Sequence, residues 1–102
     1  MAAQPYEVEY DPQALEELRA LRRFDQVKVV NAIDKYLVSR PAEVKGATIK
    51  KLDPPVLASF RLRVGDLRVF YDVVETERIV RIIAIREKGR KTLGETAHDP
   101  RD

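Results

Sequence analysis

The chain has 102 residues, a length typical of one compact domain, and it is 44% hydrophobic and 35% charged, with only 4 Gly and 6 Pro. This composition excludes collagen-like, low-complexity and wholly disordered chains. Cysteine is absent, which excludes disulfides, thiolate metal sites and a cysteine nucleophile, and the single histidine, His98, lies in a polar C-terminal segment. No apolar run reaches the roughly 20 residues that span a bilayer. We therefore expect a cytoplasmic protein without metal, cofactor or membrane partner.

The formal net charge of +2 hides a strong asymmetry along the chain. Residues 1–39 carry 5 basic and 7 acidic side chains, a net of −2. Residues 92–102 carry 1 basic and 3 acidic side chains, also a net of −2. Residues 40–91 between them carry 13 basic and 7 acidic side chains, a net of +6. A basic region of this kind is expected where one face meets a polyanion such as nucleic acid, and the alternative is a solvated charged surface.

The N-terminal part predicts a strand followed by two helices. Residues 6–10 alternate apolar and acidic side chains, as in a half-buried strand. Asp11 and Pro12 are a typical N-cap and first helical residue, and the helix that they begin ends near Arg22 and Arg23. A second helix is predicted from Asp25 to about Ser39, antiparallel to the first. The apolar stripes of the two helices are Ala14, Leu15, Leu18 and Leu21, then Val29, Val30, Ile33 and Leu37, broadened by Ala32 and Tyr36.

The C-terminal part predicts a loop followed by three strands. Residues 40–57 contain three prolines and a glycine without a sustained period, which indicates a loop. Two alternating runs flank Gly65 and Asp66, and this spacing predicts a hairpin with a two-residue type II′ turn. The facing residues then include Arg63 with Arg68. A second turn near 75–78 leads to a strand over 79–86, and a symmetric hairpin places Arg81 opposite Asp72.

These elements predict an α+β domain of order β-α-α-β-β-β, with an antiparallel two-helix hairpin packed on one face of a three-stranded antiparallel meander. We expect this domain to span residues 1–93 and residues 94–102 to form a polar, flexible tail.

Strand alternation directs Arg61, Arg63, Arg68 and Arg81 away from the apolar side of this sheet. Guanidinium groups suit phosphate because each donates two parallel hydrogen bonds and stays charged. Alternatives remain for all four: Arg81 can form an ion pair with Asp72, and Arg61 can stack on Phe70. Arg63 and Arg68 have only Asp66 within reach, and for them phosphate contact is favoured. The basic run 86–91 follows the last strand and extends the same surface.

Residues 60–71, which read Phe-Arg-Leu-Arg-Val-Gly-Asp-Leu-Arg-Val-Phe-Tyr, resemble the hairpin of the RelE/ParE superfamily of type II toxins. The order of elements over residues 6–91 agrees. The resemblance implies a small toxin neutralised by an antitoxin. RelE-like members cleave messenger RNA in the ribosomal A site, whereas ParE-like members inhibit DNA gyrase.

The resemblance also implies a site. It assigns Arg61, Arg63, Arg68 and Arg86 to catalysis by transition-state stabilisation, with Lys88 as an alternative to Arg86. The predicted RNA- and phosphate-binding residues are Lys50, Lys51, Arg81, Lys88, Arg90 and Lys91, and for the two loop lysines the alternative is a solvated charge. RelE-like toxins commonly carry a tyrosine beyond the final strand, where residues 88–93 have no aromatic residue.

Three functions follow as hypotheses. The first is a RelE-like, ribosome-dependent mRNA endoribonuclease whose partners are the ribosome, mRNA and a cognate antitoxin. The second is a ParE-like inhibitor that binds gyrase and cleaves nothing. The third is a basic surface that accepts an acidic protein partner.

Overall fold

The computed structural model describes residues 4–53 and 57–87 of the chain. They form β1 (Glu7–Tyr10), α1 (Pro12–Ala20), α2 (Arg23–Ala32), the π-helical turn η1 (Ile33–Leu37), β2 (Ile49–Lys51), β3 (Phe60–Val64), β4 (Leu67–Val74) and β5 (Ile79–Glu87). The predicted strand, two helices and C-terminal strands are confirmed, but the sheet is larger than expected. It has five strands in the order β1-β5-β4-β3-β2, with β1 parallel to β5 and all other pairs antiparallel. The predicted tail, residues 94–102, lies outside the described residues.

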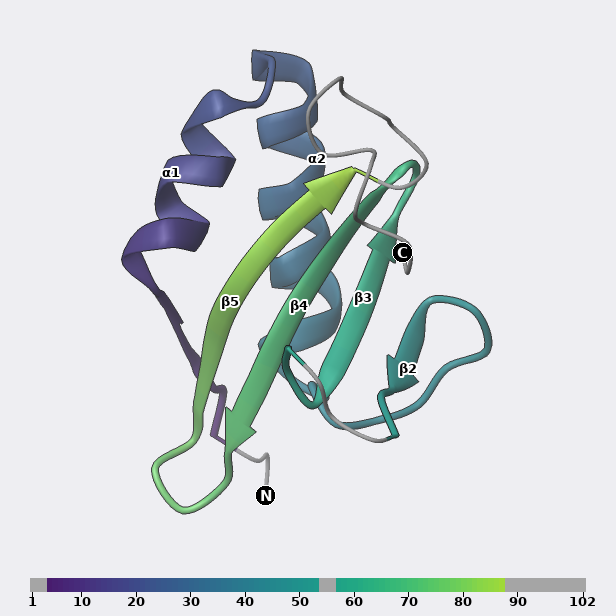
Figure 1. The fold of residues 1–102 in the computed structure, drawn as a ribbon. Coiled ribbons are helices and arrows are strands. Elements are labelled where there is room, and N and C mark those ends of the chain that lie inside the picture. The colour runs from purple at the N-terminus through teal and green to yellow at the C-terminus, as the bar shows by residue number, and fades with distance from the viewer. Residues whose placement is uncertain (1–3, 54–56, 88–102) are drawn as a thin grey trace.

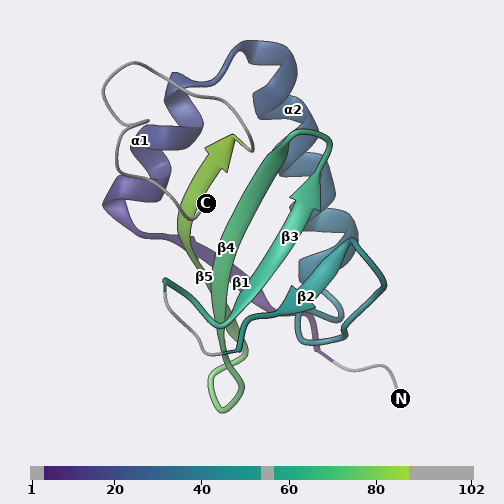
Figure 2. The same ribbon diagram turned by 45° about the vertical axis from the view of Figure 1, so that its right-hand side comes forward.

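Both helices lie on one side of the sheet, and α1 runs along β5 (Figures 1 and 2). The core fills the space between these two layers. The sheet side of this core is made of Ile49, Leu62, Val64, Leu67, Val69, Tyr71, Val80, Ile82 and Ile85, and the helix side of Ala14, Val29, Ile33 and Leu37. Burying each large aliphatic side chain contributes about 1.5–3 kcal/mol, so the sheet is fixed with its other face toward solvent.

The β3–β4 hairpin has the predicted register throughout, including Arg63 opposite Arg68 and Leu62 opposite Val69. Gly65 has a φ of +61°, whereas Asp66 is not among the residues of positive φ. A type II′ turn requires a positive φ only at its first central position, which explains why glycine stands there.

The β4–β5 pairing follows the predicted symmetric register only as far as Tyr71 opposite Ile82. The next pair is Phe70 with Ala84, so Ile83 is an extra residue that forms a β-bulge. Beyond the bulge every residue of β5 is shifted by one. Arg86 therefore lies opposite Arg68, whereas the symmetric register would have placed Ile85 there.

Residues 40–57 are not simply a loop, because β2 lies within them and pairs with β3. Only one apolar side chain, the buried Ile49, marks this strand in the sequence. One apolar residue is too few to show a period of two, and the pairing with β3 stabilises the strand.

The helix ends also differ from prediction. The first helix ends at Ala20, and α2 begins at Arg23, with Arg22 rather than Asp25 at its N-cap. Val30 was assigned to the buried stripe, but its side chain is exposed. The buried residues of this segment, Val29, Ile33 and Leu37, follow one another at intervals of four. Within the described residues, no helix is long and apolar enough to cross a membrane.

Candidate functional site: an arginine face on the open side of the sheet

Basic side chains from four adjacent strands gather on the sheet face opposite the helices. One cross-strand row consists of Arg63 on β3, Arg68 on β4 and Arg86 on β5. In the next row, Lys50 on β2 lies opposite Arg61 on β3. These five residues alternate with the core-facing residues of their strands, so they share the outer surface. We call this surface the arginine face: Lys50, Arg61, Arg63, Arg68 and Arg86.

Arg61 is a half-buried member of the arginine face. Its Nη2 donates to the carbonyl oxygen of Ala47 at 3.4 Å, while its Nε is buried and has no hydrogen-bond partner among the described residues. Burial lowers the pKa of Arg61 most, and the charges of Arg68 and Arg63 lower it further. The second effect agrees with the register, which places these three arginines at neighbouring positions of β3 and β4.

The charges of Arg61, Arg63 and Arg68 are not neutralised by any carboxylate of the described residues. Within residues 4–53 and 57–87, none of the three has a carboxylate within ion-pair distance. Like charges directly opposite one another in a sheet are destabilising. An anion bound across these side chains would remove that repulsion and would accept their hydrogen bonds.

Arg86 lies on the arginine face because the β-bulge at Ile83 shifts the register of β5 by one residue. It also has a carboxylate partner. Its Nε lies 3.5 Å from Oε2 of Glu17 on α1. The other oxygen of this carboxylate, Oε1, accepts a hydrogen bond from the backbone N–H of Ile85 at 2.7 Å. β1 pairs with β5 only as far as Ile82, so Glu17 supplies an acceptor where the neighbouring strand has ended.

Arg81 differs from the other arginines because two carboxylates hold it. It lies opposite Asp72 as predicted, but its guanidinium contacts Glu9 at 3.7 Å and Asp11 at 4.0 Å instead. The carboxylate of Asp72 accepts a hydrogen bond from the backbone N–H of Ser59 at 2.7 Å. The expected Arg81–Asp72 ion pair is therefore wrong in its partner, because β1 brings Glu9 directly beside Arg81.

The remaining predicted binding residues are not among the described residues of the arginine face. Lys51 lies opposite the core-facing Phe60, so it belongs to the other side of β2 from Lys50. Lys88, Arg90 and Lys91 lie outside the described residues. Phe70 lies opposite Arg61 as expected, but no cation–π contact joins the two within the described part of the chain.

None of the tyrosines lies on the arginine face. Tyr71 is buried on the core side, donates its hydroxyl hydrogen bond to the carbonyl oxygen of Pro41 at 2.6 Å, and has a pKa raised by burial. Tyr6, Tyr10 and Tyr36 pack against the same core. The arginine face is therefore equipped to bind a phosphate group and to stabilise negative charge that develops on it, but not for proton transfer by a tyrosine of the described residues.

No local pattern in the sequence indicates the three acidic residues that pair with these arginines, Glu9 and Asp11 with Arg81 and Glu17 with Arg86. Each lies far along the chain from its arginine, and no motif connects them. Only the packing of α1 and β1 against β5 brings these carboxylates to Arg86 and Arg81.

The fold and this face define a small α+β protein with a basic sheet surface suited to anions. Residues 8–92 match the family model described as the ParE toxin of the type II toxin–antitoxin system parDE. The chain therefore belongs to this family of the RelE/ParE toxin superfamily, as its hairpin predicted. Comparison with curated proteins gives no match.

Solved structures of the same fold include toxin–antitoxin complexes from bacteria and an archaeon. A chain of the RelBE2 complex from Mycobacterium tuberculosis superposes with a TM-score of 0.72 at 22% identity, covering 85% of this chain and 95% of that one. A chain of the RelE–RelB complex from Pyrococcus horikoshii superposes with a TM-score of 0.68 at 24% sequence identity, covering 84% of this chain and 98% of that one. A chain of the Escherichia coli RelBE complex superposes with a TM-score of 0.58 at 21% sequence identity, covering 83% of this chain and 99% of that one.

Proposed function

We propose that this type II toxin is RelE-like and cleaves messenger RNA on the ribosome. The observation that carries the proposal is the group of Arg61, Arg63 and Arg68 on the sheet face opposite the helices, which has no ion-pair partner in residues 4–53 and 57–87. A site with three close guanidinium groups suits the phosphate of an RNA backbone better than it suits an uncharged ligand.

In the proposed reaction, the ribose 2′-oxygen attacks the adjacent phosphorus while the 2′-hydroxyl loses its proton to water. The bond from phosphorus to the 5′-oxygen breaks, and that oxygen gains a proton from water. The products are a 2′,3′-cyclic phosphate and a free 5′-hydroxyl. The phosphorane formed on the way carries more negative charge than the starting phosphodiester, so fixed guanidinium groups stabilise it preferentially.

The test adds purified protein to translating ribosomes and maps messenger ends by primer extension. We expect new ends with wild-type protein and a loss of about 100-fold or more in cleavage rate for Arg68→Ala, because a positioned charge donor is removed. Arg19→Ala on the exposed side of α1 is the matched control and should cleave normally. An absence of new ends at excess protein, or undiminished cleavage by Arg68→Ala, would contradict the proposal.

A ParE-like inhibitor of DNA gyrase is the second candidate. Two observations favour it: the family model that matches is that of the ParE toxin, and all four tyrosines lie on the core side. The same preparation should therefore be tested for inhibition of gyrase supercoiling. Normal supercoiling at excess protein excludes this candidate, whereas inhibition without mRNA cleavage replaces the first proposal by it.

We further propose a cognate antitoxin as partner, supported by the antitoxin-bound state of the similar RelE structures. The outward side of α2 has apolar side chains at helical spacing, Phe24, Val27 and Val30, with exposed fractions of 68%, 48% and 41%. An amphipathic segment that folds on binding could cover this stripe.

A further inference from the structure

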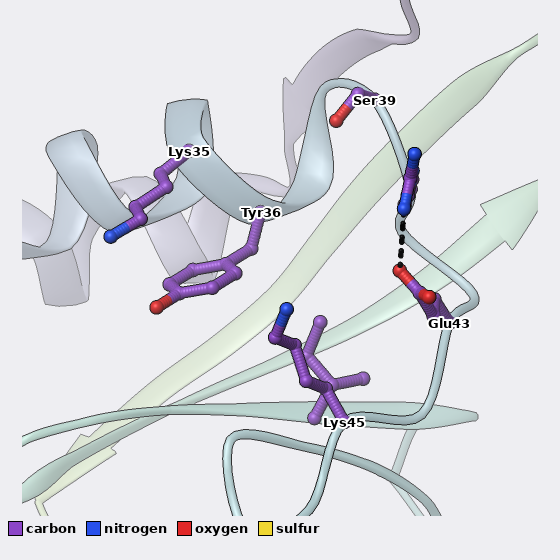
Figure 3. A pocket seen from close by; sticks show the side chains of 7 residues that line it. Lys35, Tyr36, Ser39, Glu43 and Lys45 are labelled. Carbon is purple, nitrogen blue, oxygen red and sulfur yellow. Dashed lines mark ion pairs between the residues drawn. The ribbon is translucent and has the colours of Figure 1, made fainter.

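A pocket of about 330 Å³ lies between η1 and the loop that follows it, on the helix side of the β2 edge (Figure 3). The half-buried ring of Tyr36 forms one wall, and the buried side chain of Ile49 lies at its base. The hydroxyl of Ser39 points toward the same space. A flat aromatic group can therefore be placed against an apolar surface beside a hydrogen-bonding group.

The charged lining of this pocket is mainly positive. Three cations, Lys35, Arg40 and Lys45, accompany one carboxylate, Glu43, which lies 3.6 Å from Arg40. The ammonium of Lys45 points toward Tyr36 (Figure 3), and it has no carboxylate partner within the part of the chain that the structure describes. The ammonium of Lys35 lies 5.3 Å from the Tyr36 ring centre. Lys45 is therefore the lysine available for an anionic group in the pocket, because the ammonium of Lys35 lies on the other side of the Tyr36 ring (Figure 3).

We propose that this pocket binds a phosphorylated nucleoside, with the base against Tyr36 and Ile49 and the phosphate at Lys45. A nucleotide combines a flat ring with a negative charge, and the pocket offers a counterpart for each. An acidic peptide would use the lysines but would leave the aromatic wall without a matching group. The site goes beyond the proposed function, since it requires no cleavage and lies on the other side of the sheet edge from the arginine face.

The loop from Lys45 to Ile49 separates the pocket from the arginine face. Lys45 and Ile49 pair with each other across this loop and both line the pocket. On the opposite side, the carbonyl oxygen of Ala47 accepts a hydrogen bond from Arg61, and Lys50 lies opposite Arg61. An RNA strand on the arginine face can therefore cross β2 and place one of its nucleotides in the pocket. The nucleotide has two possible sources, an RNA strand or the free pool.

The test is a titration of isotope-labelled protein, monitored by the amide signals of residues 35–49 in NMR spectra. Adenosine monophosphate, inorganic phosphate and a short single-stranded oligoadenylate are the probes. We expect Lys45→Gln to weaken nucleotide binding about five- to tenfold and Tyr36→Leu about fivefold or more. Tyr36→Phe keeps the ring and should bind like wild type. Lys28→Gln, on α2 outside the pocket, is the matched control and should also bind normally.

Each outcome has a defined meaning. Shifts with the monophosphate that match those with the oligonucleotide support a free nucleotide as the ligand. Shifts with the oligonucleotide that also involve Arg61 and Arg68 support an RNA strand. Absence of shifts at residues 35–49 with both the monophosphate and the oligoadenylate overturns the proposal, as does an affinity for inorganic phosphate equal to that for the monophosphate. A variant or preparation that does not cleave mRNA can still show the NMR shifts at residues 35–49. The experiment therefore distinguishes failure of the nucleotide pocket from failure of the proposed endoribonuclease function.

Discussion

Arg63 and Arg68 face each other across the β3–β4 hairpin with no carboxylate nearby among the described residues. A pair of like charges in this position weakens the fold, since directly opposed residues of a sheet have Cβ atoms only about 5 Å apart. Arg81 on the same sheet face shows the opposite arrangement, with Glu9 and Asp11 as partners. Positions that bind a ligand and positions that stabilise the fold can therefore be separated by the effect of mutation on stability.

We predict that Arg63→Gln raises the free energy of unfolding by a few tenths to about 1 kcal/mol at low salt, because it removes like-charge repulsion. The gain should shrink at high salt, since exposed charges are screened. Arg81→Gln should instead lower the free energy of unfolding by up to about 1 kcal/mol, because half-exposed ion pairs contribute little. Chemical denaturation at two salt concentrations measures both effects. Destabilisation by Arg63→Gln would indicate a stabilising contact that this structure does not contain.

At the scale of elements, the junction of α1 and β5 determines where the last arginine of the face lies. β1 ends at Tyr10, opposite Ile82, and the bulge at Ile83 follows immediately on β5. Glu17 then takes the place of the missing strand by accepting the N–H of Ile85 and contacting Arg86. The bulge reverses the orientation of the following residues, so that Arg86 lies opposite Arg68 on the open face.

We predict that Glu17→Ala lowers the free energy of unfolding by about 1–2 kcal/mol, because it leaves the N–H of the buried Ile85 without an acceptor. Glu17→Gln retains a carbonyl oxygen that can accept this hydrogen bond, so it should lower the free energy of unfolding by less than half as much. Denaturation of the two variants side by side gives the comparison, with Glu16→Ala on the exposed side of α1 as control. Equal stability of Glu17→Ala and wild type would mean that the hydrogen bond is replaced by water at no cost.

At the scale of the whole molecule, Tyr71 joins parts of the chain that lie far apart in sequence. Its ring stacks on Phe60 of β3 with centroids 5.5 Å apart, and its hydroxyl binds the carbonyl oxygen of the buried Pro41 after the helices. Burial raises the pKa of this hydroxyl above its ordinary value of 10.0. The folded state therefore holds the proton more tightly than the unfolded state does.

We predict that Tyr71→Phe lowers the free energy of unfolding by about 1–2 kcal/mol at neutral pH, because the buried carbonyl oxygen loses its donor. Below pH 10 this difference should be constant. Above pH 10 the unfolded wild-type chain loses its tyrosine proton and the folded chain keeps it, so wild-type stability falls by up to about 1.4 kcal/mol per pH unit relative to the variant. Denaturation from pH 8 to pH 11 tests this. A difference that grows with pH would contradict the assignment.

Much of the candidate site could be predicted from local pattern. Alternation in residues 60–74 and a glycine at the turn specify the hairpin register, and the register specifies that Arg61, Arg63 and Arg68 share a face. A slip by one residue would bury these arginines and expose Leu62 and Val69, at a large cost in free energy. The position of Arg86 could not be predicted in this way, because nothing in the sequence marks Ile83 as a bulge.

The sequence by itself determined the order of the two helices and the four longer strands, most of the core-facing residues and the three clustered arginines, because all of these depend on periodicity and on one tight turn. The tertiary structure alone decided the parallel pairing of β1 with β5, the short strand β2, the carboxylates beside Arg81 and Arg86, and the pocket at Tyr36. The pairing of β1 with β5 and these ion pairs join residues distant in the chain, and β2 and the pocket depend on how residues 35–51 pack against their neighbours. Such contacts form only when the packed core brings their elements together, and local sequence carries no record of them.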